Sequence, residues 1–221
     1  MRSLRAAISR VHYPIHSLGP GSRLGIWFQG CSIRCKGCIS TDTWDEAVAD
    51  IEIKDLIDRI RPWLIACEGI TISGGEPFNQ PEGLIGLVKA IKKIRNIDIL
   101  VYSGHPFERI ASVLEDMEGL VDVVISDPFL VSEKQTLALR GSDNQRMTLL
   151  TPLGQERFGG TDRLRNTEDD RLDLMMDENG SAWMAGIPKR GDLTRLKDLL
   201  NAEGHTCHTT EAPAHATEHS T

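Results

Sequence analysis

Three cysteines lie close together near the start of the chain: Cys31, Cys35 and Cys38, in the segment C-S-I-R-C-K-G-C. The spacing C-x3-C-x2-C places three thiols on one short loop, where they can converge on a small inorganic centre. A cubane iron–sulfur cluster usually takes four thiolates, one for each iron. Three leave one iron without a sulfur from this loop, and that iron could bind a substrate. Arg34 and Lys36 place positive charge beside sulfurs that must lose a proton to ligate.

The triplet by itself leaves other kinds of site open. A structural zinc site could use the three sulfurs together with a histidine or a fourth cysteine, and an electron-transfer cluster could recruit Cys67 or Cys207. Cys67 follows the apolar residues 64–66 at the end of an expected helix, which favours a buried structural thiol. Cys207 lies in a polar segment near the carboxyl terminus, where an uncommitted thiol is expected.

A second candidate segment is the turn G-G-E-P at 74–77, which begins 36 residues after Cys38. It follows the β-rich run 69–73 and cannot continue either regular structure well. Its two glycines let a ligand approach the backbone closely. Glu76 offers an acceptor, and Pro77 fixes the exit of the chain. The alternative is a tight strand-to-helix turn with a solvated glutamate.

Strands and helices alternate around these two segments. Strands are expected at 24–29, 69–73, 97–102 and 120–125, and amphipathic helices at 53–64, 84–91 and 110–117. A period of about 25 to 30 residues is typical of parallel strands joined by helical crossovers. The sequence therefore predicts an α/β fold with a parallel sheet. Ligands bind beyond the carboxyl ends of such strands, where both candidate segments lie.

The pattern changes after Asp127-Pro128. The expected elements there are a strand at 144–150, a hairpin at 172–183 around Asn179-Gly180, and a helix from Asp192 to about Gly204. We therefore divide the chain into a core at 1–150, a carboxy-terminal extension at 151–204, and a tail at 205–221 that is expected to be disordered.

Two more polar segments are candidates. Ser103–His105 ends the third strand at the same edge of the sheet, and Arg140–Gln145 lies further along the chain. Each could contact a cofactor or a partner, or could be a simple polar turn.

Composition narrows the class of protein. The 221 residues include 25 Lys and Arg and 32 Asp and Glu, for a net charge of −7. A chain of this length can bury a core without disulfides, and its acidic balance argues against nucleic-acid binding. No apolar run approaches the roughly 18 residues of a membrane helix, and no secretory signal is expected. Clustered cysteines without a disulfide pattern indicate metal chemistry in a reducing compartment, so we expect a cytoplasmic protein.

Together, the cysteine triplet and the G-G-E-P turn resemble the radical S-adenosylmethionine superfamily, in which these motifs follow the first and second strands. The chain is most similar to the activating proteins of anaerobic ribonucleotide reductase. Those proteins are short, their cysteine loop runs into a segment like Thr43-Trp44, and they have a later segment like Arg140–Gln145. The resemblance covers roughly residues 10–150 and implies a partial (β/α) barrel.

The resemblance also implies roles for the site residues. The three thiolates of the cysteine segment would hold three irons of a [4Fe-4S] cluster, and the amino and carboxylate groups of S-adenosylmethionine would chelate the fourth. Gly74, Gly75 and Glu76, followed by Pro77, would receive the methionine amino group, with Glu76 as the charge-complementary candidate. Gly37 would lie near the adenine.

The implied reaction is a radical transfer. One electron from the cluster would cleave the sulfonium, and the resulting 5′-deoxyadenosyl radical would take hydrogen from a glycine Cα of a partner. That partner would be a glycyl-radical enzyme, an anaerobic ribonucleotide reductase, and reduced flavodoxin or ferredoxin would donate the electron. No catalytic side chain is expected beyond the cluster ligands. The alternatives are a radical enzyme that modifies a peptide or small molecule, and a non-catalytic ferredoxin-like or zinc-binding module.

Overall fold

The centre of the fold is a six-stranded sheet in the order β2-β3-β5-β6-β7-β8. The computed structural model describes residues 3–46, 48–176, 182–206 and 208–209. The strands of the sheet are β2 (Ile8–Ile15), β3 (Arg23–Phe28), β5 (Gly69–Gly74), β6 (Ile99–Tyr102), β7 (Val123–Ser126) and β8 (Arg146–Leu149). From β3 to β7 neighbouring strands are parallel, whereas the edge strands β2 and β8 are antiparallel. The α/β fold with a mainly parallel sheet is confirmed; the partial barrel stays a prediction.

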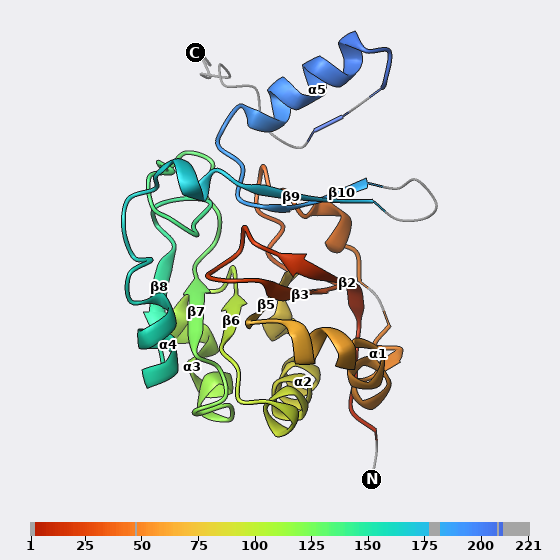
Figure 1. Cartoon of the computed structure of the whole chain (residues 1–221), viewed down its shortest axis with the longest axis vertical. Helices are drawn as coiled ribbons and strands as arrows, with labels where there is room; N and C mark the ends of the chain where they lie inside the picture. Colours follow the sequence, from red (N-terminus) through yellow and green to blue (C-terminus); the bar gives the residue numbers. More distant parts are fainter. Residues whose placement is uncertain (1–2, 47, 177–181, 207, 210–221) are drawn as a thin grey trace.

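Three helices cover one face of this sheet (Figure 1). They are α1 (Ile53–Ala66), α2 (Pro81–Ile94) and α3 (Phe107–Glu115), and each connects two parallel strands. Leu56 and Leu87 pack with Ile26, Ile72 and Val101 of the strands in the largest apolar core. Because helical residues three or four apart share a face, the apolar spacing in the sequence fixes which face is buried. None of the helices in the described ranges is long and apolar enough to cross a membrane.

The other face of the sheet carries the alternate strand residues and is covered by segments from the carboxy-terminal part of the chain. The hairpin of β9 (Leu172–Met176) and β10 (Ala182–Gly186) lies above β2 and β3 in Figure 1. Trp27 packs there with Met175 and Ala185. Helix α4 (Pro152–Phe158) covers β6 and β7, because Phe158 packs on Leu100 and Val123. Helix α5 (Asp192–Ala202) follows the hairpin.

Some elements were not predicted from the sequence. Strand β2 contains Pro14 and shows no clear alternation of apolar and polar residues, and an edge strand tolerates both features. Helix α4 is short, although its start carries usual signals: Pro152 is the first residue, and Thr151 Oγ1 accepts a hydrogen bond from Gly154 N. A two-stranded pair of β1 (Arg5–Ala6) and β4 (Ile51–Glu52) was also missed.

The expected extension is present as a hairpin and a helix. The turn around Asn179-Gly180 and most of the tail lie outside the described residues, so the turn and the disorder of the tail stay predictions. The division of the chain at 150 and 204 likewise stays a prediction.

A buried ion pair joins the strands on the side that α4 covers. Arg23 is fully buried, and its Nη2 lies 2.7 Å from Asp98 Oδ1. Its Nε donates to Thr71 Oγ1 at 2.7 Å, and its guanidinium lies over the ring of Phe158, 5.2 Å from the centroid. Arg157 Nε reaches the other oxygen of Asp98 at 3.2 Å. One guanidinium therefore contacts β5, α4 and the residue before β6.

We expect the substitution Arg23→Met to lower the free energy of unfolding by about 3 kcal/mol, because it leaves a buried carboxylate with only one partner. Urea unfolding of the metal-free, reduced protein measures this change. Arg61→Ala is the control: Arg61 and Asp58 form an exposed pair at 3.3 Å, so its loss costs less than about 0.5 kcal/mol. Equal effects of the two substitutions would contradict the prediction.

Candidate functional site

The cysteine loop follows β3 directly and is closed by a short 3-10 turn, η1 (Thr41–Thr43). Gly30 N donates to Thr43 O at 2.8 Å, and Cys31 N donates to Trp44 O at 3.1 Å. Further along, Ser40 N donates to Cys38 Sγ at 3.4 Å. Both ends of the cysteine segment are therefore held by residues of, or next to, this turn.

The G-G-E-P turn packs against the start of the cysteine loop. Gly75 N donates to Phe28 O, and Glu76 N donates to Gly30 O, both at 2.8 Å. A Cβ on Gly75 would lie 2.1 Å from Gly30 O, and one on Gly74, whose φ is +110°, would lie 2.4 Å from the backbone of Phe28. Both glycines are thus required by the close approach of two backbones. Their role toward a ligand stays a prediction.

Glu76 is fully buried, so the alternative of a solvated glutamate is wrong. Its Oε1 accepts hydrogen bonds from Phe78 N at 3.0 Å and Ser103 Oγ at 2.9 Å, and its Oε2 accepts one from Gly104 N at 2.8 Å. Burial raises the pKa of Glu76, and these hydrogen bonds act in the opposite direction. The carboxylate ties the end of β5 to the end of β6. Pro77 begins the 3-10 turn η2 (Pro77–Asn79) that follows.

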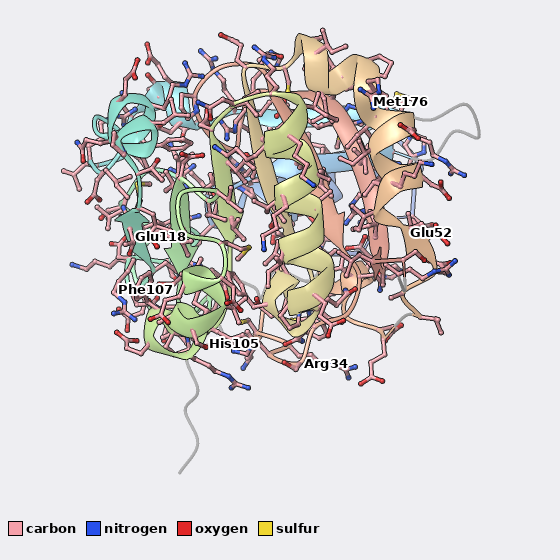
Figure 2. The ribbon with its side chains drawn as sticks, turned by 90° about the horizontal axis from the view of Figure 1, so that it is seen from below. Arg34, Glu52, His105, Phe107, Glu118 and Met176 are labelled. Atoms are coloured by element: carbon pink, nitrogen blue, oxygen red, sulfur yellow. The ribbon has the colours of Figure 1, made fainter. Side chains whose placement is uncertain are left out.

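Side chains beyond the two motifs also join them. Ser32 Oγ and the Asn79 amide exchange hydrogen bonds of 3.0 and 3.2 Å, and Asn79 Oδ1 lies 3.3 Å from His105 Nε2. Arg34 and His105 lie at the same end of the molecule (Figure 2). Of the predicted edge segment Ser103–His105, every residue thus contacts the G-G-E-P region. Asn79 carries no specific signal in the sequence, since a polar residue after a turn is common.

A cavity of about 330 Å³ opens beside Cys35. It lies between residues 33–36 of the cysteine loop and residues 128–132, which follow β7. Its volume falls in the range of about 300–1,000 Å³ typical of small-molecule sites. Gly37 adjoins this wall: its φ is +79°, and a Cβ there would meet Phe129 Cε1 at 3.5 Å. The two walls come from the carboxyl ends of strands that are distant in sequence, as the sheet topology predicts.

The segment Arg140–Gln145 supports that wall. Gln145 Oε1 accepts from Gly141 N at 2.8 Å, and Gln145 Nε2 donates to Asp127 O at 3.2 Å. Asn144 Nδ2 donates to Pro128 O at 2.8 Å. The segment is therefore a polar connection that fixes the residues lining the cavity. Phe129, which adjoins Gly37, was not predicted as a site residue from the sequence.

Burial raises the pKa of the Cys35 and Cys38 thiols, and repulsion from the neighbouring cysteines raises it further. This direction is opposite to the one expected from the charges of Arg34 and Lys36, both of which are exposed. A metal that binds these sulfurs would have to displace their protons.

Within the described ranges, no three His, Cys, Asp or Glu side chains are grouped tightly enough to hold one metal ion. An iron–sulfur cluster does not require such convergence, because each thiolate binds a different iron. Three half-buried cysteines on one loop, beside a cavity and next to a glycine turn, fit that kind of group.

Cys67 does not belong to this site. It is fully buried in the core that faces the helices, and its Sγ lies 3.7 Å from Leu64 O. The predicted structural role of Cys67 is confirmed. Cys207 lies outside the described residues.

A family model described as a 4Fe-4S single cluster domain matches residues 17–148, which is more than half of the chain. The chain belongs to the 4Fe-4S single cluster domain family. The matched span contains the cysteine loop, the G-G-E-P turn and the Arg140–Gln145 segment, whereas the hairpin β9-β10 and α5 lie beyond it. The family match supports an iron–sulfur cluster in this chain, and its ligation by the three cysteines of this loop stays a prediction.

Relatives of this 4Fe-4S chain carry activating-protein names. The anaerobic ribonucleoside-triphosphate reductase-activating protein of Escherichia coli K12 is 30% identical over 148 residues, which cover 61% of this chain and 93% of that protein. The pyruvate formate-lyase-activating enzyme of Clostridium pasteurianum is 41% identical over 81 residues, or 34% of each chain. The crystal structure of QueE from Escherichia coli matches 45% of this chain and 53% of that one, with a TM-score of 0.39 and 19% identity. The resemblance to activating proteins is confirmed.

We expect Gly75→Ala to disrupt the contact between the two motifs, because the new methyl group would overlap Gly30 O. The free energy of unfolding should fall by about 1–3 kcal/mol, and iron and sulfide incorporated on anaerobic reconstitution should fall with it. Gly160→Ala is the matched control, since a Cβ there meets nothing within 4 Å. A Gly75→Ala protein with the stability and iron content of that control would refute the requirement for close approach.

Proposed function

We propose that this chain is a radical S-adenosylmethionine activase that generates a glycyl radical on an anaerobic ribonucleoside-triphosphate reductase. The observation that carries this proposal is the direct contact between the C-x3-C-x2-C loop and the G-G-E-P turn, through Glu76 N and Gly30 O at 2.8 Å. Two motifs from separate strands thereby form one site at the carboxyl end of the sheet. The names of the activating-protein relatives support the same function.

Cys31, Cys35 and Cys38 would hold a [4Fe-4S] cluster. The amino and carboxylate groups of S-adenosylmethionine would chelate its fourth iron, and the cluster would supply the electron for the cleavage. The donor set supports this proposal, because a loop with three thiols and an adjoining cavity leaves room for a ligand at an iron that lacks a protein sulfur.

The residues of the glycine turn would receive the methionine end of the cofactor. The backbone of Gly74 and Gly75 would accept hydrogen bonds from the amino group. Glu76 has its carboxylate already bonded to three donors, so it would act by fixing the direction of that backbone and by adding negative charge nearby. Pro77 would hold the exit of the turn. Gly37, beside Phe129, would leave space for the adenine.

The remaining parts of the proposal concern the partner and the surroundings. A glycine Cα of the reductase would donate the hydrogen atom, and reduced flavodoxin or ferredoxin would donate the electron. The sheet would have the partial-barrel shape of the superfamily, whose enclosed site keeps water from the reacting groups. We expect the reaction to occur in the cytoplasm.

The test uses the anaerobically reconstituted chain with dithionite, S-adenosylmethionine and a reductase labelled with deuterium at its glycine Cα positions. We expect 5′-deoxyadenosine that contains deuterium, together with a glycyl radical signal in the electron paramagnetic resonance spectrum. Formation of 5′-deoxyadenosine without deuterium would instead favour modification of another peptide or of a small molecule. A fully loaded protein that forms none would refute the enzyme assignment.

Cysteine substitutions separate the cluster ligands from the structural thiol. We expect Cys35→Ser to abolish the 5′-deoxyadenosine yield and to lower the iron content, because an alcohol is a poor replacement for a thiolate ligand. Cys67→Ser should keep the iron content, since Cys67 lies in the apolar core. Equal iron loss in the two variants, both folded by circular dichroism, would favour an electron carrier held by four cysteines.

A further inference from the structure

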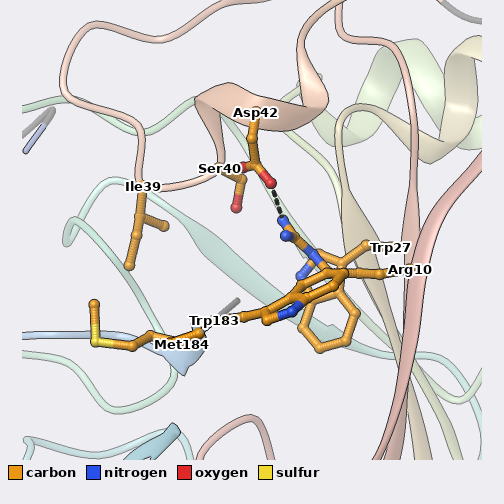
Figure 3. A pocket seen from close by; sticks show the side chains of 8 residues that line it. Arg10, Trp27, Ile39, Ser40, Asp42, Trp183 and Met184 are labelled. Atoms are coloured by element: carbon orange, nitrogen blue, oxygen red, sulfur yellow. Dashed lines mark ion pairs between the residues drawn. The ribbon is translucent and has the colours of Figure 1, made fainter. Parts of the chain in front are cut away.

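Arg10, on the edge strand β2, contacts three segments of the chain at once. Its Cζ lies 4.6 Å from the ring centroid of Trp183 on the hairpin and 5.7 Å from that of Trp27 on β3. Its Nη2 lies 2.6 Å from Asp42 Oδ2. Figure 3 shows the three side chains and the ion pair on the wall of a cavity of about 300 Å³, next to Ser40.

Asp42 is the middle residue of η1, the turn that closes the cysteine loop. Residues near it contact the cysteine loop: Thr43 O accepts from Gly30 N, just before Cys31, and Thr43 Oγ1 donates to Ser40 O at 2.7 Å. Ser40 in turn donates its N–H to Cys38 Sγ. A change in the position of Asp42 would therefore shift the residues that are hydrogen-bonded to Cys38.

The different exposures of the Arg10 and Asp42 side chains show how the two indole rings contribute to their ion pair. Asp42 is 53% exposed, and an ion pair of such a residue with a mobile arginine contributes little. The Arg10 side chain is only 17% exposed. A planar guanidinium can lie against an indole face and still direct its N–H groups to a carboxylate, which a lysine ammonium cannot do in the same way. The rings thus hold Arg10 in the orientation that binds Asp42.

The hairpin that supplies Trp183 is firmly attached. Asp173 Oδ2 accepts from Ser17 Oγ at 2.6 Å and from the backbone N–H groups of His16 and Ser17, both at 2.9 Å. The hairpin also lies beyond the 17–148 span that the family shares. The hairpin thus contacts, through one arginine, a loop that lies within the matched family span.

We propose that Arg10 is a positioning residue through which the carboxy-terminal hairpin fixes the cysteine loop and so sets the surroundings of the iron–sulfur cluster. The inference rests on the proposed function only in requiring that this loop holds the cluster. It assigns the extension a role in the cluster site, independent of which partner the activated cofactor serves.

The test measures the cluster, not the enzyme activity. Full-length variants Trp183→Ala, Trp183→Phe, Arg10→Lys and Asp42→Asn are reconstituted anaerobically. Each is followed by the electron paramagnetic resonance spectrum of the reduced cluster and by the rate of iron release to a chelator. Trp63→Ala, which removes a 39%-exposed indole from α1 on the opposite face, is the matched control.

We expect Trp183→Ala, Arg10→Lys and Asp42→Asn each to change the spectrum and to speed iron release about fivefold, the order expected from loss of one shielded cation–π contact. Trp183→Phe, which keeps an aromatic face, should restore most of the wild-type behaviour. The double variant Trp183→Ala/Asp42→Asn should release iron no faster than either single variant, because both changes break the same connection.

Spectra and release rates equal to those of Trp63→Ala would overturn the inference, as would additive effects in the double variant. If Trp183→Ala does not fold, the conservative variants decide: unchanged spectra and rates in Arg10→Lys and Asp42→Asn would overturn it. Failure of the proposed function has a different signature, because the wild-type chain would then carry its cluster but form no 5′-deoxyadenosine.

Discussion

Two backbone segments meet where β3 and β5 end, and the arrangement of the site depends on this contact. Gly30 O accepts the N–H of Glu76, and Gly75 lies so close to Gly30 that a side chain has no space. The start of the cysteine loop and the glycine turn therefore cannot move independently. Any group held by the cysteines has a fixed relation to the carbonyl and amide groups of the turn, which is the preorganisation that bond cleavage at a bound cofactor needs.

Burial of Glu76 strengthens this contact. A carboxylate in the interior is costly unless donors surround it. Here the donors are Phe78 N, Ser103 Oγ and Gly104 N, which come from the turn and from the end of the next strand. Glu76 thus joins the ends of neighbouring strands, and a substitution there would loosen the contact between the two motifs.

The carboxy-terminal extension acts on the cysteine loop from two sides. On one side the hairpin contacts Arg10, which pairs with Asp42. On the other side Arg190 donates hydrogen bonds to the carbonyls of Leu130, Val131 and Glu133, in or next to the segment that forms the second wall of the cavity. The matched family span contains the two motifs, and the segments beyond it hold the surfaces around them. In this chain, both the sheet and the carboxy-terminal extension support the loop.

Local sequence patterns were sufficient to predict much of the fold and of the candidate site. Cysteine spacing and the glycine turn predicted an iron–sulfur loop, and the alternation of strand and helix predicted the parallel sheet, because each pattern is set by neighbouring residues and by backbone periodicity. Contacts between distant segments decided the rest. Neither the burial of Glu76 nor the raised pKa of Cys35 follows from the residue types nearby, since both depend on segments that are distant in the sequence. The stacking of Arg10 with Trp183 joins residues 173 positions apart, and only the folded chain brings them together.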